Sequence, residues 1–521
     1  MAGRMRKIVL IVISGGFLIA ISVYLLITPR EERIVSIAYT TDLQGFISPR
    51  VEYGYERKSL LGGSAYLAAY IKKERKSAER ENRGFFLLDT GNFFSGQAEG
   101  YLLKGSSIID IMNNLGYDAL VIGPKDFTFG EENLRRLAKE AKFPFLGANI
   151  IKEDTDEIID YVRPYIIKEY KGIKIGIIGI TTPVVFTENI KGLKILNPFE
   201  TARKYVSILN KAGIDLIIVL SNLGLEEDKR LAQEVKDINV IIGGNDRQGY
   251  RDLWPFYIDP KNKTVIVCTC EKGMDGYRID SILDRHGKVL KYKSKLKELR
   301  AVEIKPILKI QTIVQKYTEI VQEKKKEVIG YAQTGFRNLR DKESALGNWV
   351  ADILRQKTKA DIALIAGLQA DLKQGEVTLG DVYNILPIID RLEVVGFNLA
   401  ILELTGEQIK EMLGIGVSYG LEKAGGVLQV SGLRYAYDLK RKKEDSVVEI
   451  EVGDEKLVLS RTYRVAVNSY LAAGLGGYYM VKDAKKRYDT GLMDFDVLVQ
   501  YIKEHSPISP PPLEGKITKI E

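Results

Sequence analysis

The chain has 521 residues, too many for a single hydrophobic core, so we expect at least two domains. An apolar fraction of 45% and a charged fraction of 28% are typical of folded globular proteins and argue against a disordered or fibrous chain. The net charge is +8, and no basic block carries interleaved aromatic residues, which argues against a nucleic-acid-binding protein.

Histidine is scarce, because His286 and His505 are the only two in the chain. A dinuclear hydrolase site built on imidazole ligands needs more than two, and a histidine acid–base catalyst would have to be one of this pair. Turn-forming neighbours favour an exposed turn for both. Cys268 and Cys270 lie in an apolar run, where small buried side chains are the simplest interpretation.

The N-terminus has the pattern of a membrane segment. A predominantly apolar run, Ile8 to Ile27, follows Arg4, Arg6 and Lys7, and about 20 helical residues cross a hydrocarbon core. The preceding positive charges predict a cytoplasmic N-terminus and export of the rest. A cleaved signal peptide is the alternative, although the run is long for one. We therefore expect a single-pass anchor in the cell membrane, with the domains on the extracytoplasmic side, periplasmic or extracellular.

Apolar strands and amphipathic helices alternate beyond residue 30, which predicts an α/β (α+β) fold. The expected strands are residues 34–38, 85–88, 119–122, 145–149, 173–180, 216–220 and 240–242. The expected helices are residues 64–71, 107–115, 131–142 and 202–212. Several strands end in Gly, Asp, Asn or Ser, so polar loops should gather at one edge of a sheet, where α/β proteins place their sites.

A helical repeat of apolar residues between Pro306 and Lys326 predicts a helix that joins two domains, with Pro306 in its first turn. A second α/β pattern then runs to the end of the chain, with helices at 346–357 and 406–414 and strands at 361–365 and 463–468. The expected division is an N-terminal anchor (1–30), a first domain (31–300), a linker helix (301–328) and a second domain (329–521).

Asp42 follows the first strand and is a natural ligand for a hard metal ion. A metal site of this kind would favour an imidazole two residues later, where the chain has Gln44. The same replacement of a ligand by a neutral or cationic side chain recurs in the later loops, which points to a former enzyme.

The order of the loops resembles that of the 5′-nucleotidase family. The matching segments include Gly62-Gly63, Leu87-Leu88-Asp89, Gly116–Ala119, Gly179–Pro183, Gly243-Gly244, Leu346–Asn348, Ala360–Ala363 and Leu428–Leu433. This resemblance covers nearly everything after residue 30. It implies a four-layer αββα sandwich of the calcineurin-like metallophosphoesterase type, followed by an α/β C-terminal domain that binds nucleotide.

The resemblance also implies where metals would bind, and there the chain departs from the family. The opening Asp and His are Asp42 and Gln44, and the bridging Asp is Asn92. The Asn-His pair aligns with Pro124-Lys125. Of the family's ligands and its catalytic His only Asp42 remains, with Asp89 behind it, which identifies a degenerate member. The former metal-site positions are Asp42, Gln44, Asp89, Asn92, Lys125, Asn222, Asn245 and Arg247.

The nucleotide-binding positions implied by the resemblance are altered as well. Asp371 replaces an Arg in the phosphate-side loop, which reverses the charge there. Val427 replaces one base-stacking aromatic residue, whereas Tyr470 keeps the other. The candidate ligand-binding residues are Asn348, Asp371, Tyr470 and Gly476.

We therefore expect a non-catalytic binding or partner protein without a metal cofactor, which takes a nucleotide-like small molecule or an envelope protein partner. One alternative is a divergent 5′-nucleotidase or metallophosphoesterase that hydrolyses nucleotides or other phosphate esters with an altered metal site. Mg²⁺ or Ca²⁺ would then sit among oxygen ligands from Asp42, Gln44, Asp89, Asn92, Asn222, Asn245 and Asp246. Another alternative is a structural subunit of an envelope complex.

Loss of two metal ions would leave carboxylates uncompensated in a partly desolvated site. Two former ligand positions carry permanent cations, Lys125 and Arg247. We expect both to point into the former metal site and at least one to pair with Asp42. Arg247 is favoured because its fork holds a carboxylate through two hydrogen bonds.

Overall fold

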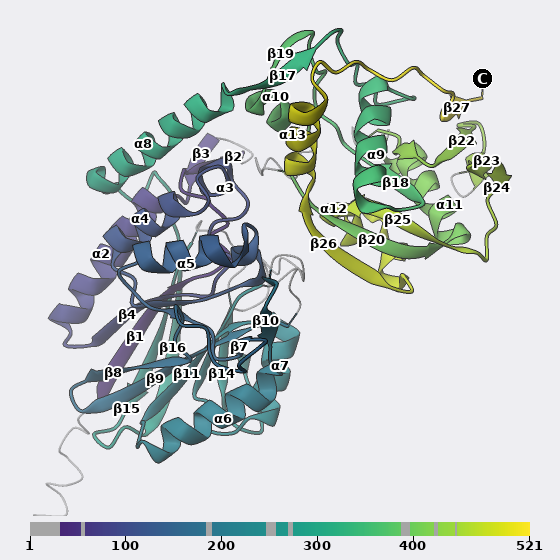
Figure 1. The fold of residues 1–521 in the computed structure, drawn as a ribbon. Coiled ribbons are helices and arrows are strands. Elements are labelled where there is room, and N and C mark those ends of the chain that lie inside the picture. Colours follow the sequence, from purple (N-terminus) through teal and green to yellow (C-terminus); the bar gives the residue numbers. More distant parts are fainter. Residues whose placement is uncertain are drawn as a thin grey trace, which may run out of the picture.

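The computed structural model describes residues 32–53, 58–183, 190–245, 257–268, 275–386, 396–420, 426–442 and 445–520. The run from Ile8 to Ile27, and with it the predicted anchor, lies outside these ranges. None of the helices within them is both long and apolar enough to cross a membrane. The described residues form two mixed α/β domains joined by helix α8 (Figure 1).

The first domain contains two six-stranded sheets. One has the order β16-β15-β1-β4-β5-β6, and its strands are β1 (Arg33–Thr40), β4 (Gly84–Asp89), β5 (Ala119–Val121), β6 (Phe145–Leu146), β15 (Asp275–Leu283) and β16 (Val289–Glu298). The other has the order β13-β14-β12-β11-β9-β8, and its strands are β8 (Tyr165–Tyr170), β9 (Ile173–Thr181), β11 (Leu216–Asn222), β12 (Val240–Gly243), β13 (Tyr257–Ile258) and β14 (Val265–Cys268). Strands β1, β4, β5 and β6 are parallel, as are β9, β11, β12 and β14.

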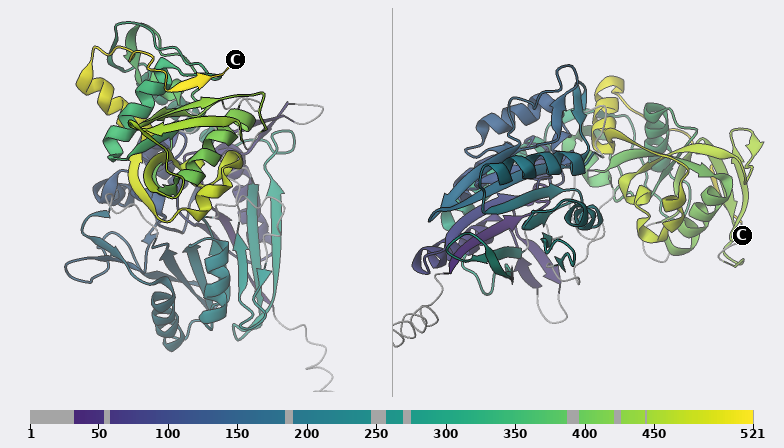
Figure 2. Two further views of the ribbon diagram at one scale, coloured as in Figure 1. Left: turned by 90° about the vertical axis from the view of Figure 1, so that its right-hand side faces the viewer. Right: turned by 90° about the horizontal axis from the view of Figure 1, so that it is seen from below.

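The two sheets pack face to face, and helices cover both outer faces (Figures 1 and 2). The alternation along β1 places Val35, Ile37 and Tyr39 in the core between the sheets and Ala38 in the core under the helices. The helices on the first sheet are α2 (Ser64–Arg80), α4 (Ser106–Leu115) and α5 (Gly130–Glu140). Those on the second sheet are α6 (Pro198–Lys211) and α7 (Leu225–Glu234). The result is a four-layer αββα sandwich.

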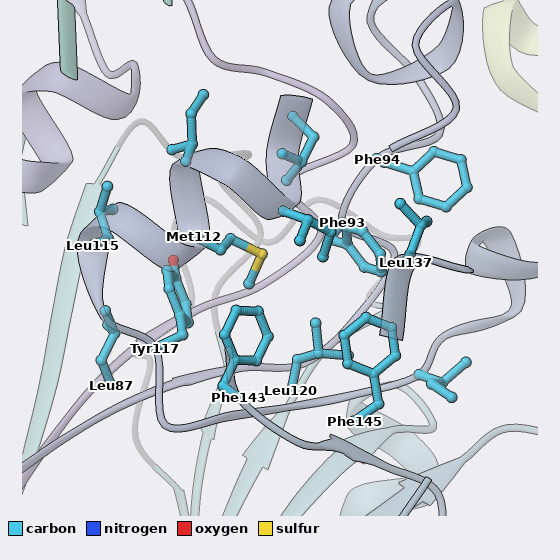
Figure 3. Close-up of a cluster of buried hydrophobic side chains, with 14 of the residues drawn as sticks. Leu87, Phe93, Phe94, Met112, Leu115, Tyr117, Leu120, Leu137, Phe143 and Phe145 are labelled. Atoms are coloured by element: carbon cyan, nitrogen blue, oxygen red, sulfur yellow. The ribbon is translucent and has the colours of Figure 1, made fainter. Parts of the chain in front are cut away.

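The core under α2, α4 and α5 is rich in aromatic residues (Figure 3). Phe93 contacts Phe94 and Phe145 edge to face, with ring centroids 5.1 and 5.9 Å apart. Phe93 and Phe94 directly follow the loop that ends β4, so this core fixes the position of that loop. The smaller elements of the domain are β2 (Arg50–Tyr53), β3 (Lys58–Leu61), α3 (Ala98–Tyr101), the 3₁₀-helix η1 (Pro124–Phe127), β7 (Ile150–Lys152) and β10 (Leu193–Ile195).

Helix α8 (Leu308–Lys325) leads from the first domain to the second and packs on α2, α3 and α4. Its N-cap is Ile307, so Pro306 precedes the helix and is not in its first turn as predicted. Ile307 has an extended backbone, with φ −78° and ψ 112°, so the helix begins only after it, and proline is compatible with the non-helical segment that precedes it.

The second domain is built on a five-stranded sheet and a four-stranded sheet. The five-stranded sheet has the order β21 (Gln429–Ser431), β18 (Ile362–Ile365), β25 (Thr462–Asn468), β20 (Asn398–Thr405) and β26 (Arg487–Met493). The four-stranded sheet has the order β24 (Glu455–Lys456), β23 (Val447–Val452), β22 (Leu433–Tyr437) and β27 (Ile517–Lys519). A two-stranded sheet pairs β17 (Val328–Ala332) with β19 (Gly375–Thr378). The helices are α9 (Ala345–Thr358), α10 (Leu379–Ile385), α11 (Gly406–Ile415), α12 (Ser469–Ala472) and α13 (Asp494–His505).

The two domains share a buried cluster at their junction. Ala98 and Tyr101 of the first domain belong to the same apolar cluster as α9, α10 and α13 of the second. The Tyr101 hydroxyl donates a hydrogen bond to Asp496 Oδ2 at 2.5 Å, and the Tyr101 ring meets Phe495 edge to face. Short helix α3 therefore anchors the second domain on the first.

Several local expectations need correction or lie outside the described residues. Residues 145–149 form only the short strand β6, because the chain turns after Leu146. His505 is exposed, but it ends α13 and stacks on Tyr501 instead of lying in a turn. His286 does lie in an exposed turn. Cys268 ends β14, and Cys270 is outside the described residues.

Candidate functional site

The loops after β1 and β4 are joined at the carboxyl edge of the first sheet. The Thr90 N–H donates to the Thr40 carbonyl at 3.1 Å, the Asp42 N–H to the Gly91 carbonyl at 3.2 Å, and the Gln44 N–H to the Asn92 carbonyl at 3.0 Å. The parallel pairing of β1 with β4 brings these loops together, because both strands end at the same edge.

Four of the predicted site residues have left-handed backbone conformations. The φ angles are 46° for Asp42, 46° for Gln44, 55° for Asn92 and 62° for Asn245. Asp and Asn adopt this region more readily than other residues with a side chain, whereas Gln does so at a cost. Strained backbone of this kind gathers at functional sites. The loops thus have the backbone geometry of a polar site.

Asp42 is the centre of a hydrogen-bonded network. Its Oδ1 accepts from Asn92 Nδ2 and its Oδ2 accepts from the Asn245 main-chain N–H, both at 2.8 Å. Asn92 Oδ1 in turn accepts from the Lys125 main-chain N–H at 3.0 Å. Because a main-chain N–H can only donate, the amide oxygen of Asn92 is held toward Lys125 and its NH₂ group toward Asp42. The structure thereby brings Asp42, Asn92, Lys125 and Asn245 together.

Asn222, at the end of β11, extends this network into the second sheet. Its Nδ2 donates to the Thr90 carbonyl at 2.5 Å, and its own carbonyl accepts from Asn245 Nδ2 at 3.4 Å. Asn222 Oδ1 and Thr90 Oγ1 are buried and have no hydrogen-bond partner among the described residues. The network therefore retains polar atoms with unused hydrogen-bonding capacity.

Asp89 lies behind Asp42 and is completely buried at the end of β4. Its carboxylate accepts from Thr40 Oγ1 at 2.6 Å and from the Gly91 N–H at 2.8 Å. Burial raises the pKa of Asp89 to about 8 against the opposing effect of these hydrogen bonds. Asp89 thus holds the turn after β4 in place.

Asp126 has a similar role and was not among the predicted site residues. Its buried carboxylate accepts from the main-chain N–H groups of Asn92, Phe93 and Gly123 at 2.8–2.9 Å. Burial raises the pKa of Asp126 to about 7. This carboxylate fixes the loops that carry Asn92 and Lys125. An acidic residue two positions after Pro124, where it can cap a helical turn, is the sequence signal that could have identified it.

Of the remaining positions of the predicted site, only Gln44 lies among the described residues. Gln44 is buried, and its carbonyl accepts from the Gln97 N–H at 2.8 Å. Arg247 and Asp246 lie outside the described residues, so the pairing of Arg247 with Asp42 stays a prediction. Across the described ranges, no group of three or more His, Cys, Asp or Glu side chains is placed to hold a metal ion.

The candidate ligand-binding residues of the second domain lie in different surroundings. A Cβ atom on Gly476 would lie 2.9 Å from the Tyr470 hydroxyl, so these two residues are neighbours. Asn348 is buried in α9 and donates to Glu343 at 2.6 Å. Asp371 is half exposed and accepts from the Asn338 N–H at 2.7 Å. Val427 is buried, so it offers no exposed surface on which a base could stack.

The fold and the position of the polar loops define a two-domain protein with a metallophosphoesterase-type sandwich. The protein-family model for the 5′-nucleotidase C-terminal domain matches residues 324–483. The trifunctional nucleotide phosphoesterase protein YfkN of Bacillus subtilis is 29% identical over 489 residues, which are 83% of this chain and 32% of YfkN. The chain thus spans about a third of that relative's length. The human 5′-nucleotidase is 26% identical over 514 residues, with 88% of this chain and 85% of the human protein covered.

Solved structures agree with these relatives. A 5′-nucleotidase precursor from Thermus thermophilus is 29% identical, with a TM-score of 0.59, and covers 94% of this chain and 99% of its own. The NAD nucleotidase of Haemophilus influenzae shares the fold with a TM-score of 0.73 at 21% identity, over 94% of this chain and 100% of its own. The chain belongs to the 5′-nucleotidase family.

Proposed function

We propose that this chain is a non-catalytic member of the 5′-nucleotidase family that binds a ligand or a partner instead of hydrolysing phosphate esters. The relatives carry names of phosphoesterases and 5′-nucleotidases, so the proposal rests on how this chain differs at the site. The differences concern the side chains at the strand ends, whereas the surrounding scaffold is kept.

The orientation of the Asn92 amide is the observation that supports the proposal most directly. A metal ion between Asp42 and Asn92 would need an oxygen from each, but Asn92 presents its NH₂ group to Asp42. Its oxygen is already bonded to the Lys125 N–H. The second oxygen of Asp42 receives the Asn245 N–H. This donor set does not fit a dinuclear metal centre, because N–H groups stand where cations would bind.

Membrane attachment and an extracytoplasmic location belong to the same proposal. The charge pattern around Ile8–Ile27 supports a single-pass anchor that leaves the two domains outside the cytoplasm. Within the second domain, the neighbouring Tyr470 and Gly476 support a nucleotide-like ligand. An envelope protein is the other candidate partner.

Metal analysis of the purified full chain, combined with a phosphatase screen, tests the loss of catalysis. We expect the purified chain to contain less than one divalent metal ion per molecule. We also expect its rate of hydrolysis of nucleotides, or of a generic phosphate ester, to be no higher than that of an Asp42→Ala variant. Tightly bound metal together with turnover that disappears in Asp42→Ala would support the alternative, a divergent phosphoesterase with an altered metal site. In that case the Asn92 amide must reorient when the ion binds.

A further inference from the structure

The outer surface formed by helix α2 and the edge strand β16 carries a dense set of cations, which we call the lysine face. On α2, Lys72, Lys73, Lys76 and Arg80 are exposed. On β16, alternate residues lie on one side of the sheet, and four of them are lysines: Lys291, Lys293, Lys295 and Lys297. Lys295 donates to Glu74 of α2 at 2.7 Å, so this side of β16 is the one turned toward α2.

Most acidic side chains at the lysine face are ion-paired, including Glu81 with Arg80 and Glu32 with Lys291, while Glu79 of α2 is exposed. Glu74 is buried and is bound by both Lys295 and Arg278. Glu303, at the border of the face, pairs with Lys297. By contrast, no acidic partner among the described residues pairs with Lys72, Lys73, Lys76 or Lys293. These cations leave the surface with an excess of positive charge.

This arrangement is unfavourable in the absence of an anion. Lys72, Lys76 and Arg80 follow each other at four-residue spacing on α2, and like charges at that spacing destabilise a helix. The surface between α2 and β16 is also hollowed. The hollow is lined by five cationic side chains and one carboxylate, Glu74, which is itself bound by Lys295 and Arg278, together with Ala69 and Ser77. The cationic residues are Lys72, Lys73, Lys76, Arg80 and Lys295. An anionic partner would relieve the repulsion and fit this hollow.

The lysine face lies close to the point where the chain leaves the apolar run Ile8–Ile27. Five residues separate Ile27 from Arg33, the first residue of β1, and they reach about 20 Å at most. Strand pairing places Lys291 opposite Ile282, which pairs with Ile34, so Lys291 is about 10 Å from the start of β1. The last turn of α2 lies at the same end, because the following strand β4 begins beside the first residues of β1.

We propose that the lysine face docks on anionic phospholipid headgroups of the membrane that holds the N-terminal run. This inference rests on the membrane attachment of the proposed function and adds a second, electrostatic contact to it. Lysine and arginine side chains are attracted to anionic headgroups within about a Debye length, and the short tether keeps this end of the domain within reach. The opposite, carboxyl edge of the strands, with Asp42 and Asn92, then faces away from the lipid.

Lysine footprinting of the full chain in lipid nanodiscs tests the proposal. The chain is incorporated into phosphatidylcholine discs or into discs with about one-third phosphatidylglycerol, and acylation of each lysine is measured by mass spectrometry. We expect Lys76, Lys291 and Lys293 to be acylated at least about threefold more slowly in the anionic discs, and the difference to vanish in about 0.5 M salt. Exposed lysines of the second domain, Lys440 and Lys456, should react equally in both discs.

A charge-reversal variant provides the matched control. One triple variant reverses three charges of the lysine face: Lys72→Glu, Lys76→Glu and Lys293→Glu. In this variant we expect Lys291 to lose its protection from acylation. The control triple variant changes the second domain instead, by Lys440→Glu, Lys456→Glu and Lys519→Glu, and should leave Lys291 protected. Equal acylation in the two kinds of disc would overturn docking while leaving the anchor intact. Inorganic phosphate added to phosphatidylcholine discs could also protect the lysines from acylation. That result would identify a soluble anion as the ligand of the lysine face and would likewise overturn docking on lipid headgroups. A chain that does not co-elute with the discs would contradict the membrane anchor itself and, with it, this proposal.

Discussion

The side-chain amide of Asn92 donates a 2.8 Å hydrogen bond to the carboxylate of Asp42, and the opposite end of the amide accepts from the Lys125 N–H. This contact joins the loops that follow three neighbouring strands of the first sheet. A neutral donor here compensates a carboxylate that is only partly exposed to water. The Asn92 amide therefore stabilises the Asp42 carboxylate in the folded domain.

Replacement of Asn92 by aspartate should destabilise the first domain. Asn92→Asp keeps the acceptor for the Lys125 N–H but places a second carboxylate oxygen against Asp42, which costs about 2–4 kcal/mol. Calorimetric unfolding near neutral pH should show the loss, and Mg²⁺ or Mn²⁺ should restore part of it in the variant only. Asn82→Asp is the matched control, because Asn82 has the same φ of 55° in an exposed turn. Equal melting temperatures for the two variants would contradict the compensating role of the amide.

The turn after β4 depends on the absence of a side chain at Gly91. Its φ is +85°, and a Cβ atom would lie 2.4 Å from the Val121 carbonyl oxygen. Gly91→Ala should therefore cost about 3 kcal/mol or more in unfolding free energy. Gly213 also has a positive φ, +67°, but nothing lies within 4 Å of its Cβ position. Gly213→Ala should thus cost only about 1 kcal/mol in unfolding free energy. A similar loss in both variants would show that the positive φ alone, and not the contact with the Val121 carbonyl, determines the cost.

The sequence predicted the strands of the sandwich well because their signal is local. Apolar β-branched runs such as Ile34–Ala38 and Ile173–Ile180 correspond to β1 and β9, with ends displaced by no more than two residues. The site loops were predictable for a related reason, since parallel strands bring their carboxyl ends to one edge. Asp42, Asn92 and Asn245 do meet there.

Which partner each polar group takes could not be predicted. The direction of the Asn92 amide depends on the Lys125 main chain, 33 residues away. Asp126 accepts hydrogen bonds from N–H groups of two separate loops, which follow β4 and β5. These loops meet only when β4 and β5 pair, so the role of Asp126 in joining them cannot be predicted from its sequence neighbours. Periodicity describes which face a residue occupies, whereas hydrogen bonds across loops depend on the folded arrangement.

The junction between the domains should be sensitive to the Tyr101 hydroxyl. Tyr101→Phe keeps the ring contacts but removes the donor to Asp496, whose pKa is already raised by burial, and should cost about 1.5–3 kcal/mol. The matched control is Tyr488→Phe, because the Tyr488 hydroxyl bonds the Glu403 carboxylate at 3.0 Å on an exposed surface. That loss should be below about 1 kcal/mol. Calorimetry of both variants checks the difference, and equal effects would exclude a special role of the junction.

Asp494, at the start of α13, should make stability fall as pH rises. Its carboxyl is completely buried and accepts from the Phe397 and Phe495 N–H groups, and burial raises its pKa to about 7. A pKa that is higher in the folded state means that the folded state binds more protons. The stabilisation is complete below the pKa that Asp494 has in the unfolded chain, about 4. It is lost as the pH rises through the pKa of Asp494 in the folded state, about 7.

Asp494→Asn tests this pH dependence, because the amide oxygen can still accept both N–H groups while no charge forms. Urea unfolding between about pH 5 and pH 8 should show the variant gaining stability relative to the original chain as pH rises, by up to about 1.4 kcal/mol per pH unit. Asp160→Asn is the control, because Arg135 holds the pKa of the exposed Asp160 carboxyl below its ordinary value. Its stabilising effect is lost only below about pH 4, so the slope between pH 5 and pH 8 should not change. Parallel pH profiles for Asp494→Asn and the original chain would show that Asp494 is not protonated in the folded protein.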